Sequence, residues 1–137
     1  MITAVDTNIL LDIFTADRKF GRRSAEALRR SLGQGAVGAC ELVWAETGTA
    51  FPDNERFLEA MHTLGIDFLP ISRDTALLAA HSWRRYRSRG GKRQRVVADF
   101  LIGAHAVTQC DQLLTRDRGF YRTSFGRLRV VGPEESS

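Results

Sequence analysis

The chain contains 137 residues, of which 43% are hydrophobic and 26% charged, and its net charge is +4 with a pI of about 9.7. This length suffices for one domain with its own hydrophobic core, and the composition excludes a disordered protein. Because no run reaches the ~20 apolar residues of a membrane helix and residues 1–6 lack the basic and apolar parts of a signal peptide, we expect a cytoplasmic protein without membrane segments.

Apolar runs alternate with helical periodicities, which is typical of an α/β domain with a central, mainly parallel sheet flanked by helices. The first half predicts a strand at 2–5, a short helix at 8–14, a helix at 24–32 with Ala25, Leu28 and Leu32 inward, a strand at 36–40 and a helix at 42–51 that Pro52 stops. The second half predicts a helix around Phe57, Met61 and Leu64, a strand at 66–71, a helix with an apolar stripe from Ala76 to Trp83, a helix at 97–109, and strands at 113–115 and 128–131. We predict one domain at residues 1–133 and a short polar tail at 134–137.

The sequence GQGAVG at residues 33–38 has the letters of a dinucleotide-binding GxGxxG fingerprint. That fingerprint follows a strand and opens a helix, whereas these glycines follow a predicted helix and precede a strand. A nucleotide-binding protein is therefore a minor alternative, and we interpret the glycines as a helix stop and turn. Cys40 and Cys110 have no CxxC partner and no histidine at ligand spacing, so we expect small buried residues instead of a zinc site or disulfide.

Four acidic residues are predicted to converge at one edge of the sheet. Asp6 directly follows the first strand and Asp117 lies just beyond the strand at 113–115, at the edge where open parallel sheets bind their ligands. Asp99 lies in the first turn of a helix, and Glu46 lies on the helix after the second strand. Singly, each has a structural explanation, such as a helix cap or a turn. Together, the four carboxylates repel one another unless a cation neutralises them, and oxygen ligands favour Mg²⁺ or Mn²⁺ over zinc.

The segments around these acids, VDTNILLDIF, ELVWAETG, VADFLIGAHA and LLTRDRGF, resemble the four acidic motifs of PIN domains in order and spacing. The resemblance extends from residue 6 to residue 120 and is greatest to the VapC-type toxins of toxin–antitoxin pairs. It implies catalytic and metal-site acids at Asp6, Glu46, Asp99 and Asp117, supported by the polar residues Asn8 and Thr115. Glu41 is a rival for the second acid, although the apolar segment followed by AET favours Glu46.

The resemblance further implies a magnesium-dependent endoribonuclease that hydrolyses RNA phosphodiester bonds. Asp6 and Asp99 would hold an ion that could lower the pKa of a bound water and orient it, and Glu46 and Asp117 would complete the pocket. The sequence leaves open whether one or two ions act. The resemblance also implies a homodimer and a cognate antitoxin whose helix docks on the toxin. We expect the antitoxin receptor, or else simple core packing, at Ile9, Leu10, Ile13, Phe14 and Phe20.

The segment before Asp99 carries seven cations, at Arg84, Arg85, Arg87, Arg89, Lys92, Arg93 and Arg95. A basic run beside an acidic site predicts an electrostatic track for an RNA backbone, with Tyr86 available for base stacking. We expect Arg116, Arg118 and Arg122 to add to the rim of this track. The alternative is a solvated helix end. Lys19 and Lys92 are the only lysines among the 20 basic residues, and this preference for arginine fits either phosphate binding or a GC-rich genome.

Two further functions are weighed against the nuclease. A phosphatase of the DxD type is disfavoured because position 8 is Asn instead of a second Asp. A PIN fold without nuclease activity, acting as an RNA-binding or interaction module, differs from the nuclease in lacking metal-dependent cleavage. His62, His81 and His105 share no motif with a nucleophile, so we expect packed or solvated residues.

Overall fold

The computed structural model describes residues 1–90 and 96–133. This part of the chain contains one sheet whose five strands all pair in parallel, in the order β3-β2-β1-β4-β5. The strands are β1 (Ile2–Val5), β2 (Ala36–Ala39), β3 (Ile66–Phe68), β4 (Gln112–Leu114) and β5 (Val130–Val131). The helices are α1 (Thr7–Phe14), α2 (Gly21–Gln34), α3 (Glu41–Gly48), α4 (Asn54–Leu64), α5 (Arg73–Ser88), α6 (Val97–Gln109) and α7 (Arg118–Ser124). The predicted α/β class with a parallel sheet flanked by helices is confirmed.

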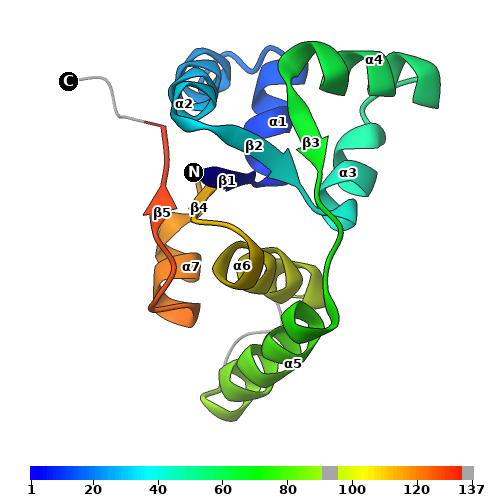
Figure 1. Cartoon of the computed structure of the whole chain (residues 1–137). Helices are drawn as coiled ribbons and strands as arrows, with labels where there is room; N and C mark the ends of the chain where they lie inside the picture. Colours follow the sequence, from blue (N-terminus) through cyan, green and yellow to red (C-terminus); the bar gives the residue numbers. More distant parts are fainter. Residues whose placement is uncertain (91–95, 134–137) are drawn as a thin grey trace.

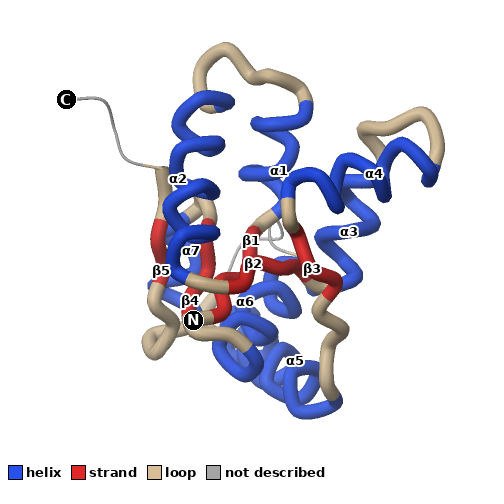
Figure 2. The backbone as a smooth tube through the Cα atoms, turned by 45° about the horizontal axis from the view of Figure 1, so that its top comes forward, coloured by secondary structure: helices blue, strands red, loops and turns tan. Residues whose placement is uncertain are grey.

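The sheet lies between two layers of helices (Figures 1 and 2). Helices α1 and α2 pack on each other on one side of the sheet, whereas α6 lies on the other side with α5 packed against it. Helices α3 and α4 lie toward the β3 edge, and α7 lies beside β5 at the opposite edge. Because all five strands are parallel, their carboxyl ends meet at one edge of the sheet, where ligands of such sheets bind.

The two central strands are buried on both faces. Residues Thr3, Ala4 and Val5 of β1 and Leu113 and Leu114 of β4 are at most 3% exposed. Strands covered by helices on both sides are continuously buried in this way, unlike strands with one solvated face. The helices complete the core with buried side chains that include Ile9, Leu10, Leu28, Met61 and Phe100.

Local sequence explains where the helices begin and end. Asp53 and Ser72 cap α4 and α5 by accepting hydrogen bonds from backbone N–H groups three residues later, at 2.8 and 3.2 Å. Gly35 ends α2 with a φ of +147°, and a Cβ there would overlap the carbonyl oxygen of Met1, so the turn needs glycine. Of the GQGAVG glycines, Gly33 lies in the last turn of α2, Gly35 ends the helix and Gly38 lies within β2. The segment therefore runs from a helix into a strand and does not form a dinucleotide-binding turn.

Several predicted details are corrected. Strands β3 and β5 are shorter than predicted, because they are edge strands whose pairing with β2 and β4 ends early. Helix α7 was not predicted, since its seven residues bury only the Tyr121 side chain and carry no periodic pattern. Leu32 is 38% exposed because Ser31 takes the inward position one residue earlier, and Cys110 is only half-buried at the end of α6, whereas Cys40 is buried. Among the described helices, none has the length and apolar character to cross a membrane.

Candidate functional site

Asp6 lies where β1 ends and α1 begins, and its side chain is buried, with only 6% exposure. Its Oδ1 accepts a hydrogen bond from the backbone N–H of Thr7 at 2.8 Å, and its Oδ2 accepts one from Thr115 Oγ1 at 2.7 Å. The helix cap that offered a structural explanation of Asp6 therefore exists. Each carboxylate oxygen can accept two hydrogen bonds, so the cap leaves acceptor capacity on Oδ1 for a further ligand.

Thr115, directly after β4, joins the ends of the two central strands through its hydrogen bonds. Its hydroxyl donates to Asp6 and accepts from the backbone N–H of Asp117 at 3.0 Å and from Asn8 Nδ2 at 3.3 Å. The same Asn8 nitrogen lies 3.4 Å from Asp6 Oδ2, and Asn8 Oδ1 accepts from the backbone N–H of Arg116 at 3.2 Å. Asn8 and Thr115 therefore hold Asp6 and the segment of Asp117 together at the carboxyl edge of the sheet.

Glu46 reaches this edge from α3. Its Oε1 accepts a hydrogen bond from Thr7 Oγ1 at 2.9 Å, and Thr7 is the neighbour of Asp6 in the chain. The rival acid, Glu41, lies at the start of the same helix and binds elsewhere, because its Oε1 accepts from the backbone N–H of Ile71 at 3.0 Å, after β3. Of the two glutamates, the structure thus brings Glu46 beside Asp6. Thr7 is a supporting residue that the sequence reasoning missed, although it stands inside the VDTN motif.

Asp99 lies in the first turn of α6 and is partly exposed. Its Oδ2 accepts a hydrogen bond from the backbone N–H of Val96 at 3.3 Å, which stabilises the helix start. Its negative charge also acts on the Asp6 carboxyl group. The beginning of α6 therefore brings a fourth carboxylate toward the edge that carries Asp6.

Burial and neighbouring acids disfavour the charged form of Asp6. The pKa of Asp6 is raised from 3.8 to about 6, first by burial and then, less strongly, by the negative charges of Asp99 and Glu46. Hydrogen bonds from Thr115 and Thr7 oppose this rise because they stabilise the carboxylate. A divalent cation beside Asp6 would remove the repulsion and favour the ionised form.

The raised pKa of Asp6 predicts a pH-dependent stability in EDTA. The unfolded chain ionises Asp6 near pH 4 and the folded chain only near pH 6, so the ionised side chain destabilises the fold above pH 6, by roughly 3 kcal/mol for a shift of this size. Between pH 7.5 and pH 5 about 1 kcal/mol of that cost is relieved. Asp6→Asn removes this cost, so the difference in unfolding free energy between the variant and the wild type, measured by urea unfolding, should shrink by this amount when the pH is lowered from 7.5 to 5. An advantage that stays constant with pH would contradict the raised pKa.

Tyr121 of α7 is a second residue that the sequence reasoning missed. It is 1% exposed, and its pKa is raised above its ordinary value, first by burial and then by the negative charges of Asp6, Asp99 and Asp117. Three of the four predicted acids therefore act on one buried hydroxyl, which stays protonated and is available as a donor. Because α7 carries no periodic pattern, no sequence signal pointed to this residue.

The donor set suits a hard divalent cation. The four predicted ligands are all carboxylates, and Mg²⁺ and Mn²⁺ prefer oxygen donors. Among the described residues, no three side chains of His, Cys, Asp or Glu stand close enough, as they are positioned, to hold an ion. Asp6 is held by hydrogen bonds, whereas Glu46 is exposed and Asp99 and Asp117 are partly exposed, so ion binding requires these three side chains to turn toward Asp6.

The arginines of the predicted RNA track that the structure describes lie at the end of α5 near Asp99. Thr75 at the start of α5 hydrogen-bonds Thr108 and Gln109 at the end of α6, so the two helices run antiparallel and the end of α5 lies beside the start of α6. The predicted track residues here are all exposed, namely Arg84, Arg85 and Arg87 in the last turns of α5 and Arg89 at its C-cap. Tyr86 is half-buried, and its ring centroid lies 5.3 Å from that of Phe100, so this ring packs on the core. Lys92, Arg93 and Arg95 lie outside the described residues.

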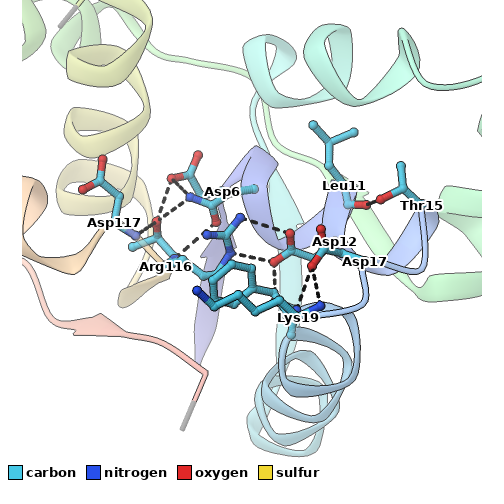
Figure 3. Close-up of polar contacts among 12 residues, drawn as sticks. Asp6, Leu11, Asp12, Thr15, Asp17, Lys19, Arg116 and Asp117 are labelled. Atoms are coloured by element: carbon cyan, nitrogen blue, oxygen red, sulfur yellow. Dashed lines mark hydrogen bonds and ion pairs between the residues drawn. The ribbon is translucent and has the colours of Figure 1, made fainter. Parts of the chain in front are cut away.

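Arg116 is engaged within the protein. Its Nε and Nη2 donate to the two carboxylate oxygens of Asp12 at 2.7 and 3.1 Å (Figure 3). Its guanidinium carbon lies 3.9 Å from the ring centroid of Phe20. Asp12 is 5% exposed and also accepts from Ser24 Oγ at 2.7 Å. This bidentate pair joins the end of β4 to α1 and α2, so Arg116 has a structural role that the sequence analysis did not identify.

The apolar residues proposed as an antitoxin receptor divide into two groups. Ile9 and Leu10 are fully buried, so for these two the core interpretation holds and the groove interpretation is wrong. Phe14 is only partly buried, and its ring packs edge-to-face on Phe51 with centroids 5.1 Å apart. Phe14 also lines an open cavity of about 370 Å³ between α1 and α4, together with Arg56, Glu59, Ala60, Thr63 and Leu64.

Comparisons with known proteins agree with this architecture. The family model for the PIN domain matches residues 3–126. The structure is similar to a chain of VapBC2 from Rickettsia felis bound to a promoter DNA fragment, with a TM-score of 0.75 and 16% identity over 98% of this chain and 100% of that chain. It is also similar to a chain of VapBC-1 from nontypeable Haemophilus influenzae, with a TM-score of 0.73 and 16% identity over 96% of this chain and 98% of that chain.

A chain of a toxin–antitoxin complex from Klebsiella pneumoniae gives a TM-score of 0.67 at 22% identity, covering 98% of this chain and 99% of that chain. No curated protein matches the chain. At identities this low, the structural matches support the fold and nothing further. Since the family model covers nearly the whole chain and all four motif acids are present within it, the chain belongs to the PIN-domain family.

Proposed function

We propose that the protein is a magnesium-dependent endoribonuclease that hydrolyses RNA phosphodiester bonds and acts in the cytoplasm as the toxin of a toxin–antitoxin pair. One observation carries the nuclease proposal: a buried carboxyl group, Asp6, whose pKa is raised while further acids approach it from other elements. Acids that repel one another cost stability unless a cation neutralises them, so the arrangement supports a site for a divalent cation. Manganese is a possible substitute, because it also prefers oxygen ligands.

In this proposal Asp6 and Asp99 bind the ion directly, and Glu46 and Asp117 complete the pocket. The bound ion would supply Lewis acidity, lowering the pKa of a water and stabilising the leaving oxygen. Thr115, Thr7 and Asn8 hold Asp6 in place through hydrogen bonds of 2.7 to 3.4 Å, which limits the rotation of its carboxylate. Thr7 Oγ1 also donates to Glu46 at 2.9 Å, which keeps this glutamate beside Asp6. No side chain of this set needs to form a covalent intermediate.

The RNA substrate is proposed because the cations near the site match a polyanion. The exposed arginines at the end of α5 lie beside the start of α6, where Asp99 is located, and can contact phosphates that flank the cleaved bond. Lys92, Arg93 and Arg95 belong to the same proposed track by sequence. Arg116 contributes less, since its guanidinium is bound by Asp12.

The antitoxin is proposed because one similar chain comes from a structure described as a toxin–antitoxin complex. On this chain the open cavity between α1 and α4, lined by Phe14 and Leu64, can take an apolar side chain of a docked helix. A basic side chain of the antitoxin could then bridge two of the site's carboxylates. We also propose that the toxin is a homodimer, as the family resemblance implies.

Expression tests the proposed function. The purified protein should cleave single-stranded RNA with Mg²⁺ and not with EDTA, and its expression alone should arrest growth. Co-expression with the product of the neighbouring gene should restore growth, and the two proteins should copurify. Folded protein that binds RNA but shows no cleavage with Mg²⁺ or Mn²⁺ would favour the inactive RNA-binding module, and unimpaired growth despite cleavage would reject only the toxin role.

A further inference from the structure

A polar cavity lies outside the acidic site, between α2 and the β4–β5 side of the sheet. Its volume is about 260 Å³. The residues that matter here are Arg30, Ser31 and Gln34 of α2, Gln112 of β4, Arg118 of α7, and Arg129 before β5; we call this set the arginine pocket. The last residues of β4 and β5, Leu114 and Val131, also line it, so the pocket reaches the sheet edge that carries the acids.

Three arginines line this one cavity without a compensating acid. No Asp or Glu of the described residues lines the pocket, and none of the three arginines forms an ion pair within residues 1–90 and 96–133. Like charges gathered in this way repel one another, and an anion in the pocket relieves that repulsion. Arginine forks match phosphate oxygens in particular, because they can donate two parallel hydrogen bonds.

The side chain of Gln112 indicates a second property of a ligand of this pocket. It is 1% exposed, and its Nε2 donates to Thr3 Oγ1 at 2.9 Å and to Gln34 Oε1 at 3.2 Å. Its Oε1 is buried and accepts no hydrogen bond from the described part of the chain. A buried acceptor without a donor is costly, so a ligand of this pocket should donate a hydrogen bond as well as carry negative charge.

Arg118 connects the pocket to the acidic site. It follows Asp117 directly, and its side chain passes over Gly132, where a Cβ would lie only 2.9 Å from Arg118 Nε. Glycine at position 132 thus leaves the space that the Arg118 side chain occupies. A nucleic-acid strand that crosses the acids therefore has a cationic surface next to Asp117, on the side of the sheet opposite α6 and α5.

We propose that the arginine pocket binds a nucleotide of the RNA substrate next to the cleaved bond. Phosphate oxygens accept from Arg30, Arg118 and Arg129, and a ribose hydroxyl or base N–H donates to Gln112 Oε1. A ribonucleotide supplies both kinds of group, which satisfies both requirements of the pocket. This inference rests on the proposed ribonuclease function, but it concerns RNA binding and is measured without cleavage.

The test compares two double variants of equal charge. Arg30→Gln with Arg129→Gln removes two pocket arginines, and Arg29→Gln with Arg127→Gln removes two exposed arginines from the same segments but outside the pocket. Binding of a fluorescein-labelled ten-nucleotide single-stranded RNA is measured by anisotropy in EDTA, at several salt concentrations. We expect the pocket variant to lose at least about tenfold in affinity and to flatten the salt slope by about 0.7 for each phosphate that the variant no longer binds. The control variant should stay within about twofold of the wild type, and thermal melts should show both variants folded.

Equal loss of affinity in the two variants, or RNA binding unaffected by either, would overturn the pocket assignment. Poly-glutamate serves as a competitor: if it binds the wild type more tightly than the RNA and loses binding in the pocket variant, the pocket recognises an acidic peptide and the RNA assignment is wrong. Cleavage with Mg²⁺ is measured on the same preparations. If the wild type cleaves RNA but the pocket and control variants bind RNA equally well, the pocket assignment alone is wrong. If RNA binding depends on the pocket but no cleavage occurs, the nuclease proposal is wrong and the pocket assignment stands.

Discussion

Asp6→Asn and Asp99→Asn are each expected to lower the rate of Mg²⁺-dependent RNA cleavage by more than about 100-fold, because losing even a residue that only orients a metal ligand costs 10–100-fold. Asparagine keeps the shape of aspartate and removes the charge that holds a cation. At position 6 it can still accept from the Thr7 N–H, so the start of α1 should persist. Single-turnover cleavage of a labelled RNA measures the loss.

Asp74→Asn is the matched control for Asp99→Asn. Both acids lie in the first turn of a long helix, but Asp74 is exposed at the start of α5, the end of that helix away from the arginines that lie near Asp99. The control should cleave at the wild-type rate, and Mg²⁺ should raise its melting temperature as it does for the wild type, since an ion that binds only the folded state stabilises it. Asp6→Asn and Asp99→Asn should lose that metal-dependent rise. Wild-type cleavage by either variant would show that the acid in question is not a ligand.

The acids at the strand ends could be predicted because their positions follow from topology. Once β1 and β4 are identified as buried parallel strands, Asp6 and Asp117 must lie at the same edge of the sheet. The choice between Glu41 and Glu46 did not follow in this way, since both lie on α3 and periodicity places neither. Their hydrogen-bond donors differ, because the Thr7 hydroxyl donates to Glu46 and the Ile71 N–H donates to Glu41. Both contacts join elements that are distant in the sequence, so the sequence does not show them.

The features that sequence reasoning missed depend on tertiary partners. The hydrophobic pattern of α1 marks Ile9, Leu10 and Phe14 alike, but only the packing of α1 against α2 and α3 shows that the first two are core. Tyr121 lies on a seven-residue helix that is too short for a detectable period. Arg116 looked like part of a basic rim because a sequence shows charge and not the buried carboxylate that binds it.

Arg116→Ala is expected to lower the free energy of unfolding by about 3 kcal/mol, the low end of the range for removing one partner of a buried ion pair. The variant loses two charge-assisted hydrogen bonds to Asp12 and the packing of the guanidinium on Phe20. Asp12, at 5% exposure, then keeps only the Ser24 hydroxyl as a side-chain partner within the described residues. The low end applies because the Arg116 side chain is itself 31% exposed, so water can partly replace it.

Urea unfolding in EDTA measures this loss, with Arg22→Ala as the control. Arg22 forms an exposed pair with Glu26 on α2, its side chain is 92% exposed, and the loss of such a pair changes stability by at most about 1 kcal/mol. A double-mutant cycle with Asp12→Ala should give a coupling energy within the roughly 0.5–3 kcal/mol range of contacting residues, because each single change removes the same pair.

If Arg116→Ala unfolds like the wild type but binds RNA several-fold more weakly, Arg116 belongs to the RNA surface. If it is destabilised and its folded fraction binds RNA with wild-type affinity, the residue fastens the end of β4 to α1, as the contacts with Asp12 indicate.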